Sequence, residues 1–200
     1  VDVDVDLGGG RWLRGTVPGV FGNRLVPVSY SRLGPGHRLQ SWLAVLALSA
    51  ADPDRNWTAH TVGRPTNGRS RDDHAVSLLG PVDDYTARDV LGQLVTLRDH
   101  GLAGPLPMPV KTSHAYATLR RTQASPAEAR RKAEWVWQDG RYPGECSDAA
   151  HLRVWGPRSP LPGLHERPLT GEEHPGETDR FGALALRLWS PLLSNEQGSW

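Results

Sequence analysis

The sequence predicts a mixed α/β fold, in which a central sheet is flanked by helices and followed by a more helical C-terminal part. Short apolar segments, several of them with a period of two, recur through the first 80 positions and are typical of strands. Apolar residues at helical spacing over 84–101 and 179–193 predict helices. The chain has 200 residues, which is enough to bury a core without a disulfide.

Three strands and a helix are expected first. Residues 1–7 alternate valine with aspartate, which predicts a strand with one wet face. Segments 12–20 and 25–30 predict two further strands, joined by a tight turn at Gly22-Asn23. We expect these three strands to form an antiparallel meander. After the break at 34–36, apolar positions at helical spacing predict a helix that packs against the meander.

The later elements follow from turn and capping signals. Segments 57–62 and 75–79 predict strands separated by a polar loop over 63–71. Prolines at alternate positions make 104–111 an extended connector. Ser125, Pro126 and Glu128 form a capping box that predicts a helix to about residue 138. The Pro/Gly-rich region 140–177 is expected to be mobile, with a short helical turn over 149–155.

Composition restricts the function classes only partly. A net charge of +1 argues neither for nor against nucleic acid. The single Cys146 excludes an internal disulfide and a multi-cysteine zinc site. Because the sequence also shows no apolar leader, we expect a cytoplasmic protein. The longest apolar run, 42–51, is too short for a bilayer span, so no membrane contact is expected. Because the chain starts with Val1, we expect it to be a piece of a longer polypeptide.

No cofactor or metal is predicted. The phosphate-loop, dinucleotide, zinc-protease, esterase and EF-hand patterns are missing from the sequence. Asp2, Asp4 and Asp6 would share one strand face, but neighbours two apart are about 7 Å apart, so a wet strand edge is favoured over a cation site. The histidines near Cys146 and Glu145 lack the fixed spacing of a metal site.

Two sets of side chains are candidates for binding. Arginines bind phosphate through charge-assisted hydrogen bonds, although a solvated surface is the alternative. The candidates for DNA contact are Arg64, Arg69, Arg71, Arg120 and Arg121. Aromatic residues dominate buried interface cores, although packing in the domain core is the alternative. The candidates for a partner interface are Trp12, Trp155 and Trp189.

Three segments resemble the core of the PD-(D/E)XK nucleases, namely 13–18, 26–32 and 40–48. In that family two acids hold magnesium, a lysine assists, and a glutamine opens the helix. The resemblance places Pro18 at the first acid, Ser29 at the second and Ser31 at the lysine, while Gln40 is retained. It therefore implies a nuclease-like fold that has lost its catalytic residues.

Further motifs narrow the resemblance. Segments 97–102, 104–112, 144–148, 153–155 and 186–193 are similar, in order and spacing, to elements of the C-terminal domain of the exodeoxyribonuclease V gamma subunit family (RecC). This resemblance implies that 1–200 is a single nuclease-like C-terminal domain. A sheet-helix core would occupy 1–103, and a helical, Pro/Gly-rich extension would occupy 104–200.

The RecC resemblance implies a noncatalytic scaffold in a heterotrimer. Such a subunit assembles with a beta helicase-nuclease and an alpha helicase, contacts double-stranded and split DNA, and acts in double-strand break repair by recombination. Recognition of the Chi signal would lie in upstream domains. Two alternatives stay open: an active magnesium-dependent nuclease with ligands among Asp2, Asp4 and Glu145, and an independent single-strand-binding module using exposed Trp and Arg.

Overall fold

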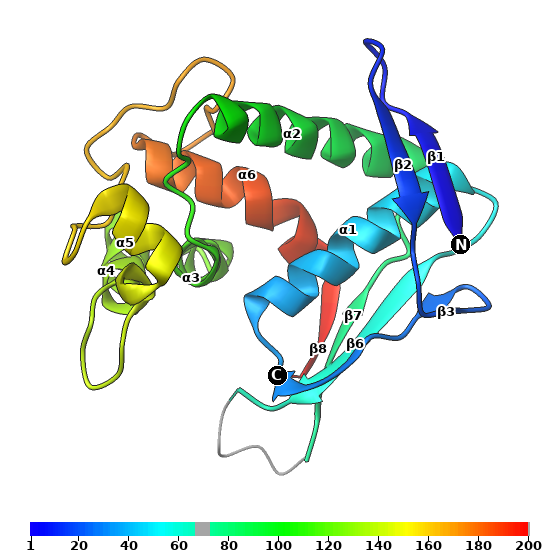
Figure 1. The fold of residues 1–200 in the computed structure, drawn as a ribbon, viewed down its shortest axis with the longest axis horizontal. Coiled ribbons are helices and arrows are strands. Elements are labelled where there is room, and N and C mark those ends of the chain that lie inside the picture. The colour runs from blue at the N-terminus through cyan, green and yellow to red at the C-terminus, as the bar shows by residue number, and fades with distance from the viewer. Residues whose placement is uncertain (67–72, 200) are drawn as a thin grey trace. The chain divides into compact units, whose positions relative to one another are not determined.

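The structure is a computed structural model that describes residues 1–66 and 73–199. The chain divides into two compact units, Val1–Val95 with Ser194–Trp200, and Thr96–Leu193. Helix α2 (Asp84–Ala103) begins in the first unit and ends in the second, and the last strand, β8 (Glu196–Ser199), belongs to the first. The predicted mixed α/β class is confirmed (Figure 1).

The first unit contains a separate hairpin and a mixed sheet. Within residues 1–66 and 73–199, strands β1 (Asp2–Asp6) and β2 (Trp12–Thr16) form a two-stranded antiparallel sheet of their own. Val3 and Val5 are buried on one face of β1, while the three aspartates are exposed on the other, as the alternation predicts. The six-stranded sheet consists of β3 (Val20–Phe21), β4 (Arg24–Leu25), β5 (Val28–Arg32), β6 (Thr58–Arg64), β7 (Ala75–Leu79) and β8.

The predicted antiparallel meander is confirmed in part: β1 pairs with β2 and β3 pairs with β4, both in antiparallel register, but the two pairs belong to separate sheets. The segment expected as one strand over 12–20 ends at Thr16 and resumes at Val20, because Pro18 lacks a backbone donor. Pro27 likewise separates β4 from β5, and both short strands run parallel to β6. The turn at Gly22-Asn23 is confirmed, since Phe21 pairs with Arg24 across it. Strands β7 and β8 continue the sheet in antiparallel fashion.

Helix α1 (Pro35–Ala51) packs against β1, as expected for the helix that follows the first strands, and also against β6 and β7 (Figure 1). It begins with proline in the first turn, where a missing N–H costs nothing. Trp42, Val45 and Leu46 are fully buried on its inner face. The facing strands bury alternate residues, Ala59 and Thr61 among them, so this helix–sheet contact forms the core of the first unit.

The second unit is helical. Helices α3 (Val110–Arg121) and α4 (Pro126–Trp137) pack against each other, and the capping box predicted at Ser125 and Glu128 is confirmed. A short 3₁₀ turn, η1 (Glu145–Ser147), leads to α5 (Ala149–Trp155), and α6 (Arg180–Ser194) supplies most of the buried apolar side chains. Helix α3 was not predicted, because its first residues were assigned to the extended connector.

Ion pairs tie the Pro/Gly-rich segment to the helices of the second unit. The side chains of Glu172 and Glu177 are fully buried and pair with Arg180 and Arg120 at 2.7 Å. Asp179 accepts a hydrogen bond from the Gly182 N–H at 2.8 Å and so caps α6. None of the helices in the described part of the chain combines the length and the apolar character that crossing a membrane requires.

Candidate functional site

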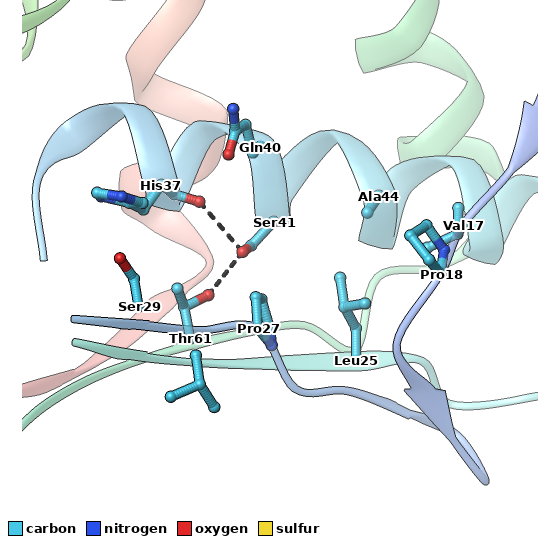
Figure 2. Close-up of a pocket in the computed structure, with 11 residues that line it drawn as sticks. Val17, Pro18, Leu25, Pro27, Ser29, His37, Gln40, Ser41, Ala44 and Thr61 are labelled. Atoms are coloured by element: carbon cyan, nitrogen blue, oxygen red, sulfur yellow. Dashed lines mark hydrogen bonds between the residues drawn. The ribbon is translucent and has the colours of Figure 1, made fainter. Parts of the chain in front are cut away.

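A cavity of about 320 Å³ lies in the first unit between α1 and the strands β4 and β5 (Figure 2). It forms where Pro18 and Ser29, two of the positions expected to be degenerate, meet the helix. Its lining residues are Val17, Pro18, Leu25, Pro27, Val28, Ser29, His37, Gln40, Ser41, Ala44 and Thr61. The sequence reasoning therefore brought residues from three separate segments to one site.

Two hydroxyl groups link the helix to the sheet inside this cavity. The oxygens of Ser41 and Thr61 are 2.6 Å apart, and the Ser41 hydroxyl also donates to the His37 carbonyl at 3.1 Å (Figure 2). Both residues are almost fully buried. Each hydroxyl therefore has a hydrogen-bond partner although it is buried, and the bond between the two hydroxyls links α1 to β6.

The three expected catalytic positions have different environments. Pro18 is exposed at the cavity, and Ser29 is half-buried in its lining. Ser31 is exposed and is not among the lining residues. Gln40 lines the cavity from the second turn of α1. The two residues that the resemblance places at the acids therefore line the cavity, whereas the residue that it places at the lysine does not.

A bulge in β5 accounts for the position of Ser31. Val28 pairs with Val62, and Arg32 pairs with Arg64. The part of β5 between these two pairs is therefore longer than the facing part of β6. Within the bulge the Ser31 N–H donates to the Ser29 hydroxyl at 3.1 Å, and Tyr30 is 93% exposed. Because the extra residues break the alternation of the strand, residues 29 and 31 do not share a regular strand face.

The polar groups of the cavity are hydroxyls, the imidazole of His37 and the amide of Gln40. A hard cation such as Mg²⁺ needs carboxylate ligands, and none lines this cavity. Over residues 1–66 and 73–199, no group of three or more His, Cys, Asp or Glu side chains could hold a metal ion. The lining therefore offers hydrogen-bonding groups and apolar side chains, but no negative charge.

The carboxylates of the alternative nuclease hypothesis are engaged elsewhere. Asp2 accepts from the Thr16 hydroxyl at 2.5 Å, and Asp4 pairs with Arg14 at 3.0 Å. The buried Glu145 in the second unit accepts the backbone N–H groups of Lys111 at 3.0 Å and Thr112 at 2.7 Å. Glu145 therefore caps the N-terminus of α3, where a negative charge is favourable.

A buried ion pair supports α1 on the sheet, and sequence reasoning missed it. The Arg38 Nε donates to Glu196 Oε1 at 2.6 Å, and the Ser77 hydroxyl donates to the same carboxylate at 2.5 Å. Both charged side chains are almost completely buried. The only sequence signal is a charged residue inside the apolar surface of α1, and it does not identify a partner 158 positions away.

The DNA-contact candidates differ in their accessibility. Arg64 is exposed at the end of β6, and Arg121 is exposed at the end of α3. Arg69 and Arg71 lie outside the described residues. Arg120 is largely buried, and its guanidinium bonds to Glu177 at 2.7 Å and to the Ala124 carbonyl at 2.5 Å. Arg120 thus has a structural role in the second unit.

The three tryptophan candidates also differ. Trp12 on β2 is 52% exposed, with the Arg14 guanidinium 4.8 Å from its ring centre. Trp155 is half-buried at the end of α5. Trp189 is completely buried, and its indole N–H donates to the Ser113 hydroxyl at 2.9 Å. Trp189 is a core residue, the alternative that the sequence left open.

The chain matches known proteins over most of its length. Residues 1–121 match the model of the RecC C-terminal domain family. A protein named RecBCD enzyme subunit RecC from Mycobacterium tuberculosis is 47% identical over 196 residues, and its namesake from Mycolicibacterium smegmatis is 49% identical over 196 residues. Each match covers 98% of this chain but 17% of the relative. This chain therefore belongs to the RecC family, and its residues 1–121 correspond to the C-terminal domain of that family.

Proposed function

We propose that the chain is a noncatalytic domain of the gamma subunit of a RecBCD-type helicase-nuclease, the exodeoxyribonuclease V that repairs double-strand breaks by homologous recombination. Support comes from the two relatives, whose name is RecBCD enzyme subunit RecC. The chain spans 17% of their length, so activities of the whole subunit enter here only as part of the proposal. A role on chromosomal DNA implies a location in the cytoplasm.

The observation that carries the noncatalytic role is the composition of the cavity between α1 and β5. By the resemblance to the nuclease core, proline and serine stand at the positions of the metal-binding acids, and Ser31, which lies in the bulge of β5, is not among the lining residues. Neither a hydroxyl nor a proline ring supplies the negative charge that a magnesium ion needs. The domain would then contribute surface contacts to the assembly.

The proposed partners are the beta subunit (RecB), the alpha subunit (RecD) and DNA at the fork. Trp12 on the hairpin β1–β2 is exposed, with the Arg14 guanidinium over its ring, and an exposed aromatic ring of this kind suits an interface anchor. Arg64 and Arg121 are exposed and have no ion pair within the described chain, so they are available to phosphates.

Back-substitution tests the catalytic part of this proposal. The triple variant Pro18→Asp, Ser29→Asp, Ser31→Lys restores the residue types of an active nuclease but not the regular strand. We expect it to remain inactive with Mg²⁺, because the bulge misdirects residue 31. Magnesium-dependent cleavage by the triple variant would contradict this expectation. It would mean that the bulge in β5 does not prevent catalysis and that the three side chains are sufficient for it.

Assembly is tested by binding to separated subunits. Immobilised chain should retain purified RecD or RecB homologues from the same organism, and Trp12→Ala should weaken that retention. Tyr85→Ala, which removes an exposed aromatic ring from α2, is the matched control. Retention of neither subunit by the immobilised chain, or equal retention by the chain and its Trp12→Ala variant, would count against this interface.

A further inference from the structure

The second unit has its own cavity, of about 330 Å³, at the C-terminal end of α4. It is lined by Lys111, Trp135, Val136, Gln138, Asp139, Gly140, Arg141, Tyr142, Pro143, Gly144 and Glu145. Both α4 and the first turn of α3 contribute, together with the loop over 138–144. Most of these residues lie beyond 1–121, the part that the family model matches.

Two exposed aromatic rings line this one cavity. Trp135 is 73% exposed and Tyr142 is 74% exposed, although large aromatic rings are usually buried. The Lys132 ammonium lies 4.2 Å from the Trp135 ring centre, and the Arg141 guanidinium lies 5.8 Å from that of Tyr142. Each ring therefore combines a stacking surface with a nearby positive charge.

The negative groups of the cavity are already satisfied by protein donors. Asp139 accepts the Ser147 hydroxyl at 2.7 Å and the Gly144 N–H at 2.7 Å. Glu145 is occupied in capping α3. Lys111 and Arg141 are exposed and form no ion pair with any described residue. The oxygens of both carboxylates are thus held by neutral donors of the protein, and Lys111 and Arg141 are charged side chains of the lining that extend into solvent without an ion pair to a described residue.

We propose that this cavity binds one nucleotide unit, with its base stacked on Trp135 and Tyr142 and its phosphate on Lys111 and Arg141. Stacking on aromatic rings beside basic side chains is the chemistry that holds single-stranded nucleic acid without sequence preference. The volume lies at the low end of ligand pockets, which suits a single base. The proposal goes beyond the scaffold function and does not depend on it.

The test is fluorescence anisotropy of the full chain with a labelled oligothymidylate at low salt. Removing a stacking ring costs about 1–3 kcal/mol per base, so Trp135→Ala and Tyr142→Ala should each weaken binding roughly 5- to 150-fold. Lys111→Gln should weaken binding and flatten its salt dependence. Tyr85→Ala removes an exposed ring outside this cavity and should leave the affinity unchanged.

Competitors identify the source of the ligand. Displacement by thymidine monophosphate at concentrations near the affinity of the strand would point to a free nucleotide, whereas displacement only by single strands would point to nucleic acid. Both results support the site. Absence of oligonucleotide binding, equal loss in the Tyr85→Ala variant, or displacement by an uncharged proline-rich peptide alone would overturn it. Far-ultraviolet circular dichroism of each variant checks the fold.

Discussion

Replacing Arg38 by methionine tests whether α1 depends on its buried ion pair. The substitution keeps a long side chain but removes the guanidinium that pairs with the buried Glu196. The Ser77 hydroxyl, which also donates to this carboxylate, is neutral and does not replace the lost charge. Removing one partner of a buried pair costs about 3–5 kcal/mol, because the remaining charge is neither solvated nor paired. For a chain of this size each kcal/mol corresponds to about 2–4 °C, so the melting temperature should fall by roughly 6–20 °C.

Thermal unfolding followed by circular dichroism measures this loss. Arg55→Met is the matched control, because Arg55 pairs with Asp52 at the surface and such pairs contribute at most about 1 kcal/mol. The double variant Arg38→Met, Glu196→Gln should regain part of the stability, since no buried charge remains and Ser77 keeps an acceptor. A loss below about 1 kcal/mol in the single variant would refute the reasoning.

Two further predictions concern the second unit. Gly144→Ala should destabilise the chain by about 1–3 kcal/mol, because an added Cβ would lie 2.2 Å from the Gln138 carbonyl oxygen, whereas Gly140→Ala, with open space around it, should have little effect in the same urea titration. The pKa of Glu172 responds first to burial, which raises it, but hydrogen bonds from Arg180 prevail and hold it below its usual value. A lowered folded-state pKa gives stability that is present above the unfolded value of about 4.3 and is lost as pH falls through the folded value. Glu172→Gln should therefore flatten the acid side of the stability–pH curve, and an unchanged acid limb would contradict this assignment.

The elements predicted correctly are those whose signals are local. The helical spacing of apolar residues in α2, the capping box of α4 and the turn at Gly22-Asn23 can each be recognised within one continuous segment, and all three are confirmed. Strand β8 was missed because Glu196–Ser199 is short and polar and is a strand only through its pairing with β7. Pairing between distant segments has no local signature, so the split of the meander into two sheets and the parallel pairing of its third segment with β6 were missed for the same reason.

The candidate site was predicted in part. The resemblance to a nuclease core relates Pro18, Ser29 and Gln40 to two successive strands and the helix that follows them, and all three residues line one cavity. It could not predict the bulge in β5, since a change of register depends on pairing with β6. The aromatic pair Trp135 and Tyr142 was also missed, because nothing local distinguishes an exposed tryptophan from a buried one.

A cleavage assay with the purified chain tests the central claim most directly. Single- and double-stranded DNA are incubated with the chain in Mg²⁺ or Mn²⁺, with chelator as the blank, and the products are separated by size. We predict the same product level with metal as with chelator, because the cavity offers no carboxylate to a cation. Metal-dependent cleavage that disappears in an Asp4→Asn or Glu145→Gln variant would contradict the account.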